Sequence, residues 1–174
     1  EELHRLAMGL RPASLDYLGL VEALEQLVKS MDGRSGLSIH FKAIGFPEEQ
    51  RLPNHIETNI YRIVQEALCN VRKHSKAHTV RVLMRSQNDG QYRVLIEDDG
   101  TGLTSLPSSG APGEHVGLSI MEERARRLGG KIRFESEPGE GTRIQLTFRA
   151  PAKTGGNGMN EVSLPLPTVG KTRP

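Results

Sequence analysis

The sequence of 174 residues predicts an α+β fold, a two-layer sandwich in which helices cover one face of a mixed sheet. Three observations predict it. Segments that alternate apolar and polar residues are grouped in hairpins, and segments with helical periodicity separate the groups. The sequence contains no internal repeat. A domain of this size buries roughly 70% of the surface of its unfolded chain, which is enough for one hydrophobic core.

The first third of the chain predicts two helices and a strand. Leucines at helical spacing indicate a helix over residues 1–11, and Pro12 disfavours helical backbone at the residue before it. Ser14 is expected to cap a second helix that ends at Met31. Residues 37–44 alternate apolar and polar, as a half-buried strand does.

The remaining elements follow from periodicity and from turn residues. A strongly periodic helix is expected first, then a hairpin closed by Asp89-Gly90, then a loop with four glycines and two prolines that suits a lid. A helix, two strands and a Gly- and Pro-rich tail expected to be disordered complete the chain. The ranges are 53–76 for the long helix, 79–86 and 91–98 for the hairpin, 99–115 for the loop, 116–128 for the last helix, 131–136 and 142–149 for the last strands, and 151–174 for the tail.

Composition excludes several classes of protein. A formal net charge of +2 is not the electrostatic signature of a nucleic-acid-binding domain. The single cysteine, Cys69, rules out an internal disulfide and favours a reducing compartment. No run of about 18 apolar residues is present. The sequence begins at Glu1 within a helical pattern, so we expect a fragment whose parent carries any membrane anchor upstream.

Four polar residues follow one stripe of the long helix, beside its apolar stripe. They stand at positions i, i+4, i+7 and i+8 and are Glu66, Asn70, Lys73 and His74. An amide oxygen suits Mg²⁺, an ammonium suits phosphate and a carboxylate can act as a base. The alternative is a solvated flank, because charged helix flanks are common.

Three further segments combine glycines with polar residues. Asp98 ends an apolar strand and can accept a hydrogen bond from a ligand N–H, while Gly100 and Gly102 permit close approach, although a plain turn fits as well. Residues 113–118 lie at the start of a helix, where free N–H groups favour phosphate. The alternative is that they form only a hinge and a helix cap. Residues 139–142 read as a hairpin turn.

Together these segments resemble the nucleotide-binding boxes of the GHKL superfamily, which includes gyrase, Hsp90, histidine kinases and MutL. Residues 66–74 resemble the N box, Asp98-x-Gly100-x-Gly102 the first glycine box, residues 116–118 the second, and Gly139-x-Gly141-Thr142 the third. Each motif is weak alone, whereas four in order over about 75 residues are specific.

The resemblance implies roles for individual residues. Asp98 would bind the adenine amine of ATP, Asn70 would hold Mg²⁺, and Glu66 would activate the phosphoryl acceptor. The other residues would contact phosphate or shape the pocket and lid: Lys73 and His74 for phosphate, Gly100, Gly102, Gly117 and Leu118 for the pocket and lid, and Thr142 beside Asp98. The chemistry implied is phosphoryl transfer, in which positioning and charge neutralisation dominate.

A narrower resemblance concerns sensor histidine kinases of the nitrate/nitrite-sensor type. Residues 61–68, residues 116–125 and the Leu10-Arg11-Pro12 segment carry it. It implies that residues 1–31 end the dimerisation helices, that 32–150 form the ATP-binding catalytic domain and that the acceptor histidine lies upstream of this chain. A cytoplasmic domain, a homodimer of the full-length protein, a response regulator as partner and a parent anchored in the inner membrane complete the expectation.

Two other functions stay open at this point. One is another GHKL enzyme, either a mechanical ATPase or a serine-phosphorylating anti-sigma-type kinase, although the Leu-Arg-Pro segment favours the sensor kinase. The other is a non-catalytic nucleotide-binding module, which the intact Asn70, Asp98 and Gly102 disfavour.

Overall fold

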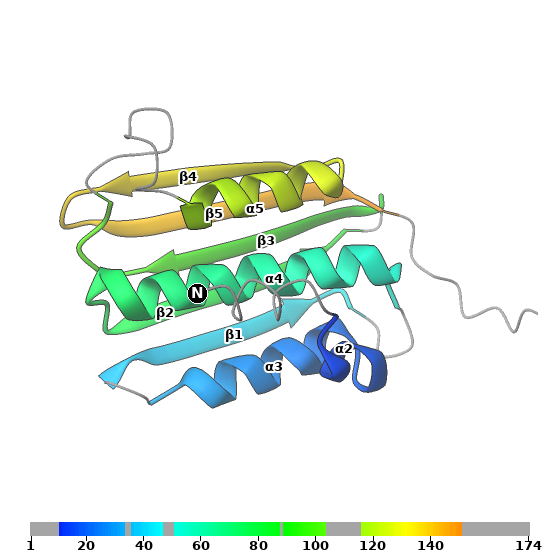
Figure 1. Cartoon of the computed structure of the whole chain (residues 1–174), viewed down its shortest axis with the longest axis horizontal. Coiled ribbons are helices and arrows are strands. Elements are labelled where there is room, and N and C mark those ends of the chain that lie inside the picture. Colours follow the sequence, from blue (N-terminus) through cyan, green and yellow to red (C-terminus); the bar gives the residue numbers. More distant parts are fainter. Residues whose placement is uncertain (1–10, 34–35, 47–50, 88, 104–115, 151–174) are drawn as a thin grey trace, which may run out of the picture.

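A five-stranded mixed sheet and the helices on one of its faces make up the computed structural model (Figure 1). The structure describes residues 11–33, 36–46, 51–87, 89–103 and 116–150. Its helices are α2 (Ala13–Tyr17), α3 (Leu20–Met31), α4 (Asn54–Asn70) and α5 (Val116–Arg127), with a π-helical turn, η2 (Val71–Ser75), continuing α4. Its strands are β1 (Ser38–Ile44), β2 (Thr79–Ser86), β3 (Gln91–Asp98), β4 (Lys131–Glu137) and β5 (Gly141–Arg149).

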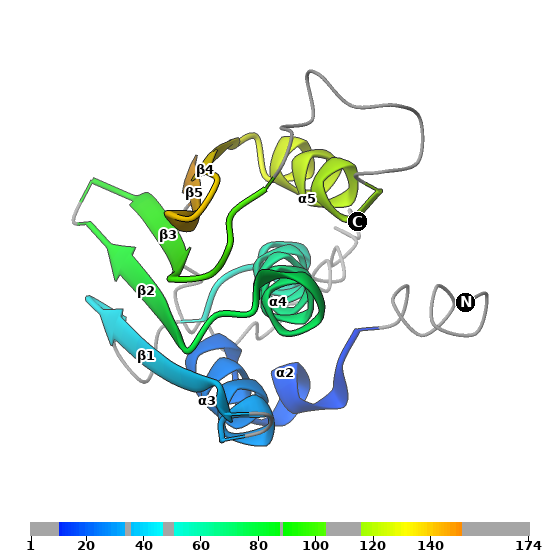
Figure 2. The ribbon, with the colours of Figure 1, turned by 90° about the vertical axis from the view of Figure 1, so that its left-hand side faces the viewer.

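The strands are arranged in the order β1-β2-β3-β5-β4. β1 and β2 pair in parallel and are joined through α4, whereas the other three pairs are antiparallel. Figure 2 shows the sheet as one layer and all the helices as a second layer on a single face. The predicted fold class is therefore confirmed, including the mixed sheet and its one covered face.

Alternation along the strands produces the two faces of the sheet. In β2, for example, Val80, Val82 and Met84 are buried against the helices, while Arg81 and Arg85 are exposed on the other face. The edge strand β4 shows the same alternation, with Ile132 packed against the core between charged, exposed neighbours. Burying a Val, Leu or Ile fully contributes about 1.5–3 kcal/mol, so this pattern fixes the register of every strand.

One hydrophobic core joins all four helices to the sheet. Leu24 and Val28 of α3 belong to the same buried cluster as Ile60 and Val64 of α4. The helices α2 and α3 therefore pack as part of the compact domain. The functional boundary between residues 31 and 32 remains a prediction, and the helix expected over 1–11 lies, apart from Arg11, outside the described residues.

The second predicted helix is wrong in two respects. It is divided into α2 and α3 at Leu18 and Gly19, where Gly19 adopts a φ of 89° that favours glycine. Ser14 is not a cap, because Pro12 precedes the helix and Ser14 lies within its first turn, with its carbonyl accepting the N–H of Leu18 at 2.9 Å. Helical periodicity continues across the break and so does not reveal it.

The other predicted elements agree with the structure within one or two residues. The exception is the end of the long helix, where residues 71–75 form the wider π-helical turn and Lys76 then adopts left-handed backbone at φ 53°. Most of the predicted lid and the whole predicted tail lie outside the described residues. Among the described helices, none combines the length and the apolar character that a membrane span requires.

Candidate nucleotide site

The contact between α4 and α5 brings three predicted residues together. Gly117 lies in the first turn of α5, and a Cβ atom built on it would stand 2.5 Å from Oε1 of Glu66 and 3.1 Å from Nδ2 of Asn70. Glycine at this position thus lets the start of α5 approach the two polar side chains. Leu118, the next residue, is buried in the core, so its packing fixes the helix start.

The π-helical turn changes the directions of the residues that follow Asn70. Its i→i+5 hydrogen bonds widen the turn, so the constant α-helical step used to place four residues on one stripe is wrong beyond Asn70. Lys73 and His74 are exposed on this turn. Turns of this kind inside helices occur frequently at functional sites. A phosphate-binding role for the two cations stays a prediction.

Ser75, which sequence reasoning missed, ends the π-helical turn and connects it to the first glycine box. Its buried hydroxyl donates to the carbonyl of Val71 at 2.9 Å, and its carbonyl accepts the N–H of Thr101 at 2.7 Å. A Cβ on Gly100 would lie 2.6 Å from the Cβ of Ser75. The end of the helix and the first glycine box are therefore locked together through a residue that carries no sequence signal of its own.

Asp98 lies at the end of β3, between Val80 of β2 and Thr142 of β5 in the sheet register. Its Oδ1 atom accepts the N–H of Gly100 at 2.9 Å. Burial raises the pKa of Asp98 above the ordinary value for aspartate, and the charge of Asp99 adds to the rise, while N–H groups of Gly100 and Thr142 oppose it. A carboxylate has acceptor positions beyond these two N–H groups, so a half-buried one suits a ligand that brings an N–H of its own.

Asp99 has the opposite environment and a structural role. Its Oδ1 atom accepts the backbone N–H groups of His78 and Thr79, each at 2.8 Å. These hydrogen bonds, with that of Thr79 the strongest, lower the pKa of Asp99. The carboxylate of Asp99 therefore closes the start of β2 onto the end of β3.

Ser136 of β4 ties the first glycine box to the third. Its hydroxyl accepts the N–H of Leu103 at 2.7 Å, donates to the carbonyl of Gly141 at 2.8 Å, and lies 3.1 Å from the hydroxyl of Thr142. Gly102, with φ 70°, would place a Cβ 3.1 Å from this hydroxyl. The missed signal is that Ser136 follows Ile132 and Phe134 on the inward face of β4, where a polar residue is unexpected.

The predicted residues thus form two groups. Asp98 and Thr142 pair at the ends of β3 and β5, with Gly102 against the end of β4. Glu66, Asn70 and Gly117 meet where α4 contacts α5. The contact between Gly100 and Ser75 links the groups at the base of the site.

The two neighbouring aspartates are expected to titrate in opposite directions from the ordinary value. Native Asp98 holds its proton more tightly than the unfolded chain does, so the fold gains stability as the pH falls through the raised pKa. Asp99 stabilises the fold above its unfolded pKa, and this contribution is lost as the pH falls through its lowered pKa. Carboxyl ¹³C titration by NMR checks the order, and an Asp99 midpoint above that of Asp98 would contradict it.

Known proteins resemble both the sequence and the fold. The family model described as histidine kinase-, DNA gyrase B-, and HSP90-like ATPase matches residues 55–152, more than half of the chain. The signal transduction histidine-protein kinase/phosphatase DegS of Brevibacillus brevis is 36% identical over 147 residues, which are 84% of this chain and 36% of that protein. The sensor histidine kinase LiaS of Bacillus subtilis is 32% identical over 145 residues, 83% of this chain and 38% of that protein.

Two solved structures share the fold. The histidine kinase domain of the blue-light activated histidine kinase EL346 from Erythrobacter litoralis aligns with a TM-score of 0.62 at 22% identity, over 79% of this chain and 68% of that one. Full-length ShkA in complex with AMPPNP aligns with a TM-score of 0.60 at 21% identity, over 87% of this chain and 35% of that one. This chain spans well under half the length of the curated relatives named above. The chain belongs to the histidine kinase-, DNA gyrase B-, and HSP90-like ATPase family.

Proposed function

We propose that this domain binds Mg-ATP and transfers the γ-phosphoryl group to a histidine on an upstream dimerisation helix of the same sensor kinase. The observation that carries the proposal is the half-buried carboxylate of Asp98, which stands opposite Thr142 of β5 where Gly100 and Gly141 let the backbone approach closely, and whose pKa is raised by burial. The relatives named above are histidine kinases, and one similar structure contains an ATP analogue.

The residues present fit the adenine end of ATP. Asp98 would accept a hydrogen bond from the exocyclic amine of adenine, and Thr142 stands opposite it across the β3–β5 pair. Gly100 and Gly102 let the backbone approach Ser75 and Glu137 closely, which would shape this end of the pocket. A charged acceptor strengthens such a hydrogen bond relative to a neutral one.

The residues present also fit the phosphate end. Asn70 offers an amide oxygen of the kind that Mg²⁺ accepts, beside the first turn of α5, whose N–H groups favour anions. The metal ion, when bound, would neutralise charge on the transferred phosphoryl group. Lys73 and His74 would supply further positive charge, and Leu118 would hold the start of α5 in place through its burial.

Glu66 is the residue that we propose activates the acceptor histidine. It would accept the proton of the imidazole N–H, on the ring nitrogen that does not attack, as the other ring nitrogen forms the new P–N bond and the bond between the γ-phosphorus and ADP breaks. Its carboxylate lies close to Gly117 at the α4–α5 contact, on the same helix as Asn70. The proposal further includes a homodimer of the full-length kinase, a response regulator that receives the phosphoryl group, and a cytoplasmic location where ATP is supplied.

Calorimetric titration with Mg-ATP tests the proposal on three proteins. The unsubstituted chain is expected to bind with an affinity that falls when Mg²⁺ is removed. Asn70→Ala is expected to lose this magnesium dependence, because the amide oxygen is gone, whereas Asn70→Asp retains an oxygen ligand and much of the dependence. Circular dichroism controls for folding. A folded, unsubstituted chain that binds no Mg-ATP would favour a non-catalytic module.

A further inference from the structure

We propose that Arg11 and Glu57 are positioning residues, through which the chain entering the domain is fixed relative to the helix that carries Glu66 and Asn70. The inference rests on the proposed function, because it concerns the delivery of an upstream acceptor to this domain. Arg11 precedes every described helix, and Glu57 stands in the first turn of α4. The two residues are 46 positions apart in the sequence.

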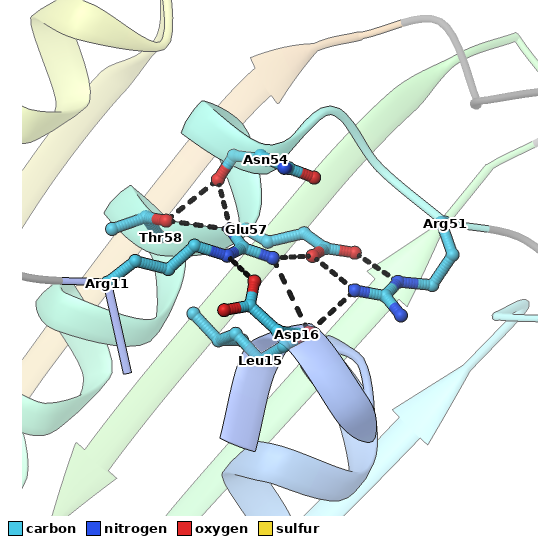
Figure 3. A network of polar contacts seen from close by, with 7 residues as sticks. All are labelled: Arg11, Leu15, Asp16, Arg51, Asn54, Glu57 and Thr58. Carbon is cyan, nitrogen blue, oxygen red and sulfur yellow. Dashed lines mark hydrogen bonds and ion pairs between the residues drawn. The ribbon is translucent and has the colours of Figure 1, made fainter. Parts of the chain in front are cut away.

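The guanidinium of Arg11 contacts three groups of α4, as Figure 3 shows. It donates to Oε2 of Glu57 at 2.9 Å, to the carbonyl of Asn54 at 2.6 Å and to the hydroxyl of Thr58 at 2.9 Å. A fourth contact, from Nε to the carboxylate of Asp16, holds the guanidinium against α2. A planar guanidinium that is held by several acceptors fixes the orientation of residue 11 relative to α4 as well as its distance from α4.

Arg51 holds the same carboxylate from the other side. It donates to Oε1 of Glu57 at 2.9 Å and to Oε2 at 3.0 Å, and also to the carbonyl of Leu15 at 2.6 Å. The side chain of Glu57 is only 1% exposed, so its charge requires a partner. Arg51 alone supplies a partner that contacts both carboxylate oxygens, so charge balance does not account for the additional contact from Arg11.

The degree of burial also separates the two arginines. The side chain of Arg11 is 20% exposed and that of Arg51 is 36% exposed, and neither residue lies in a helix. Ordering a long side chain at the entry to a domain costs conformational entropy, which the five hydrogen bonds of Arg11, including one to the carbonyl of Leu15, offset. Pro12 further restricts the backbone of Arg11. Together these contacts attach the entering chain to α4 itself.

The position of this attachment gives it a functional meaning. α4 has 17 residues, and Glu57 lies nine residues before Glu66 and thirteen before Asn70 on the same helix. A helix of this length is a rigid body of about 25 Å. Arg11 therefore fixes the position of the chain at residue 11 relative to α4, the helix that carries the residues proposed for phosphoryl transfer. Misplacement by about 1 Å at a reacting centre can lower a rate about a hundredfold.

The test compares Arg11→Gln with Arg51→Gln in the full-length kinase that carries the upstream helix. Both variants leave one arginine on Glu57: Arg51, which contacts both carboxylate oxygens, remains in Arg11→Gln, and Arg11, which contacts Oε2, remains in Arg51→Gln. Arg11→Gln is expected to lower the autophosphorylation rate at saturating Mg-ATP by about tenfold or more, with an Mg-ATP dissociation constant within about twofold of the unsubstituted protein. Arg51→Gln is expected to change that rate by less than about twofold.

Arg11→Lys provides a conservative variant. Its autophosphorylation rate is expected to lie between those of Arg11→Gln and the unsubstituted kinase, because an ammonium cannot reach all the acceptors of the guanidinium. Equal autophosphorylation rates in Arg11→Gln and the unsubstituted kinase would overturn the positioning role. Equal losses of rate in both glutamine variants would also overturn it, as would losses of rate proportional to the fall in melting temperature. Absence of Mg-ATP binding by the unsubstituted kinase would instead defeat the proposed function itself.

Discussion

Replacing Asp98 by Asn is expected to weaken Mg-ATP binding about a hundredfold or more, which corresponds to about 2.7 kcal/mol. The substitution removes the charge of a half-buried acceptor and can place an amide N–H against the adenine amine, so that two donors meet. The change is isosteric, so the backbone contact with Gly100 retains its space. Calorimetric titration of the variant with Mg-ATP measures the loss.

The neighbouring Asp99→Asn variant is the matched control. Asp99 binds the N–H groups of His78 and Thr79, so its substitution is expected to lower the melting temperature and to change nucleotide affinity far less than Asp98→Asn does. Equal losses of affinity in both variants would mean that the site depends on the local fold alone. Unchanged affinity in Asp98→Asn would remove the assignment of adenine to this carboxylate.

Replacing Gly141 by Ala is expected to lower the free energy of unfolding by about 3–5 kcal/mol and to damage the nucleotide site as well. Gly141 has φ 80°, and a Cβ there would lie within 3.0 Å of the carbonyl oxygen of Asp98 and 2.9 Å from its carbonyl carbon. The clash involves backbone, so the strand ends that carry Asp98 must separate. Chemical denaturation measures the stability, and titration with Mg-ATP measures the site.

Gly139→Ala is the control that carries the backbone strain of positive φ without the steric contact. Gly139 lies in the same turn with φ 86°, yet a Cβ there would meet nothing within 4 Å. Its substitution is expected to cost only the strain of positive φ, about 1–2 kcal/mol, and to leave nucleotide affinity close to that of the unsubstituted chain. If the two alanine variants lost equal stability, the close approach of Gly141 to Asp98 would not be the cause.

Strands and hairpins could be predicted closely because each depends on local patterns. Alternation in 79–86 and 91–98 and the Asp89-Gly90 pair placed β2 and β3 at the observed residues. The insertion of β5 between β3 and β4 could not be predicted, because alternation tells which face a residue occupies and not which strand lies beside it. Long-range packing decides that order.

The candidate site was predictable in its residue types and less so in its geometry. The ideal-helix projection placed Glu66 near Asn70, and the structure brings both to Gly117. It could not show the π-helical turn, because Arg72 and Lys73 are ordinary helix formers and the turn depends on contacts beyond them. Ser75 carried no signal, since its contribution to the base of the site includes its backbone carbonyl.

The edge of the sheet at β4 bears on the behaviour of the domain at high concentration. Within the described residues β4 pairs with β5 alone, so its other side presents unpaired backbone groups, a template on which strands of other molecules can assemble. The outward-facing side chains of this edge are all ionisable, namely Lys131, Arg133, Glu135 and Glu137. A strand that added here would have to dehydrate these charges, so the sequence that builds the sheet also opposes aggregation through its edge.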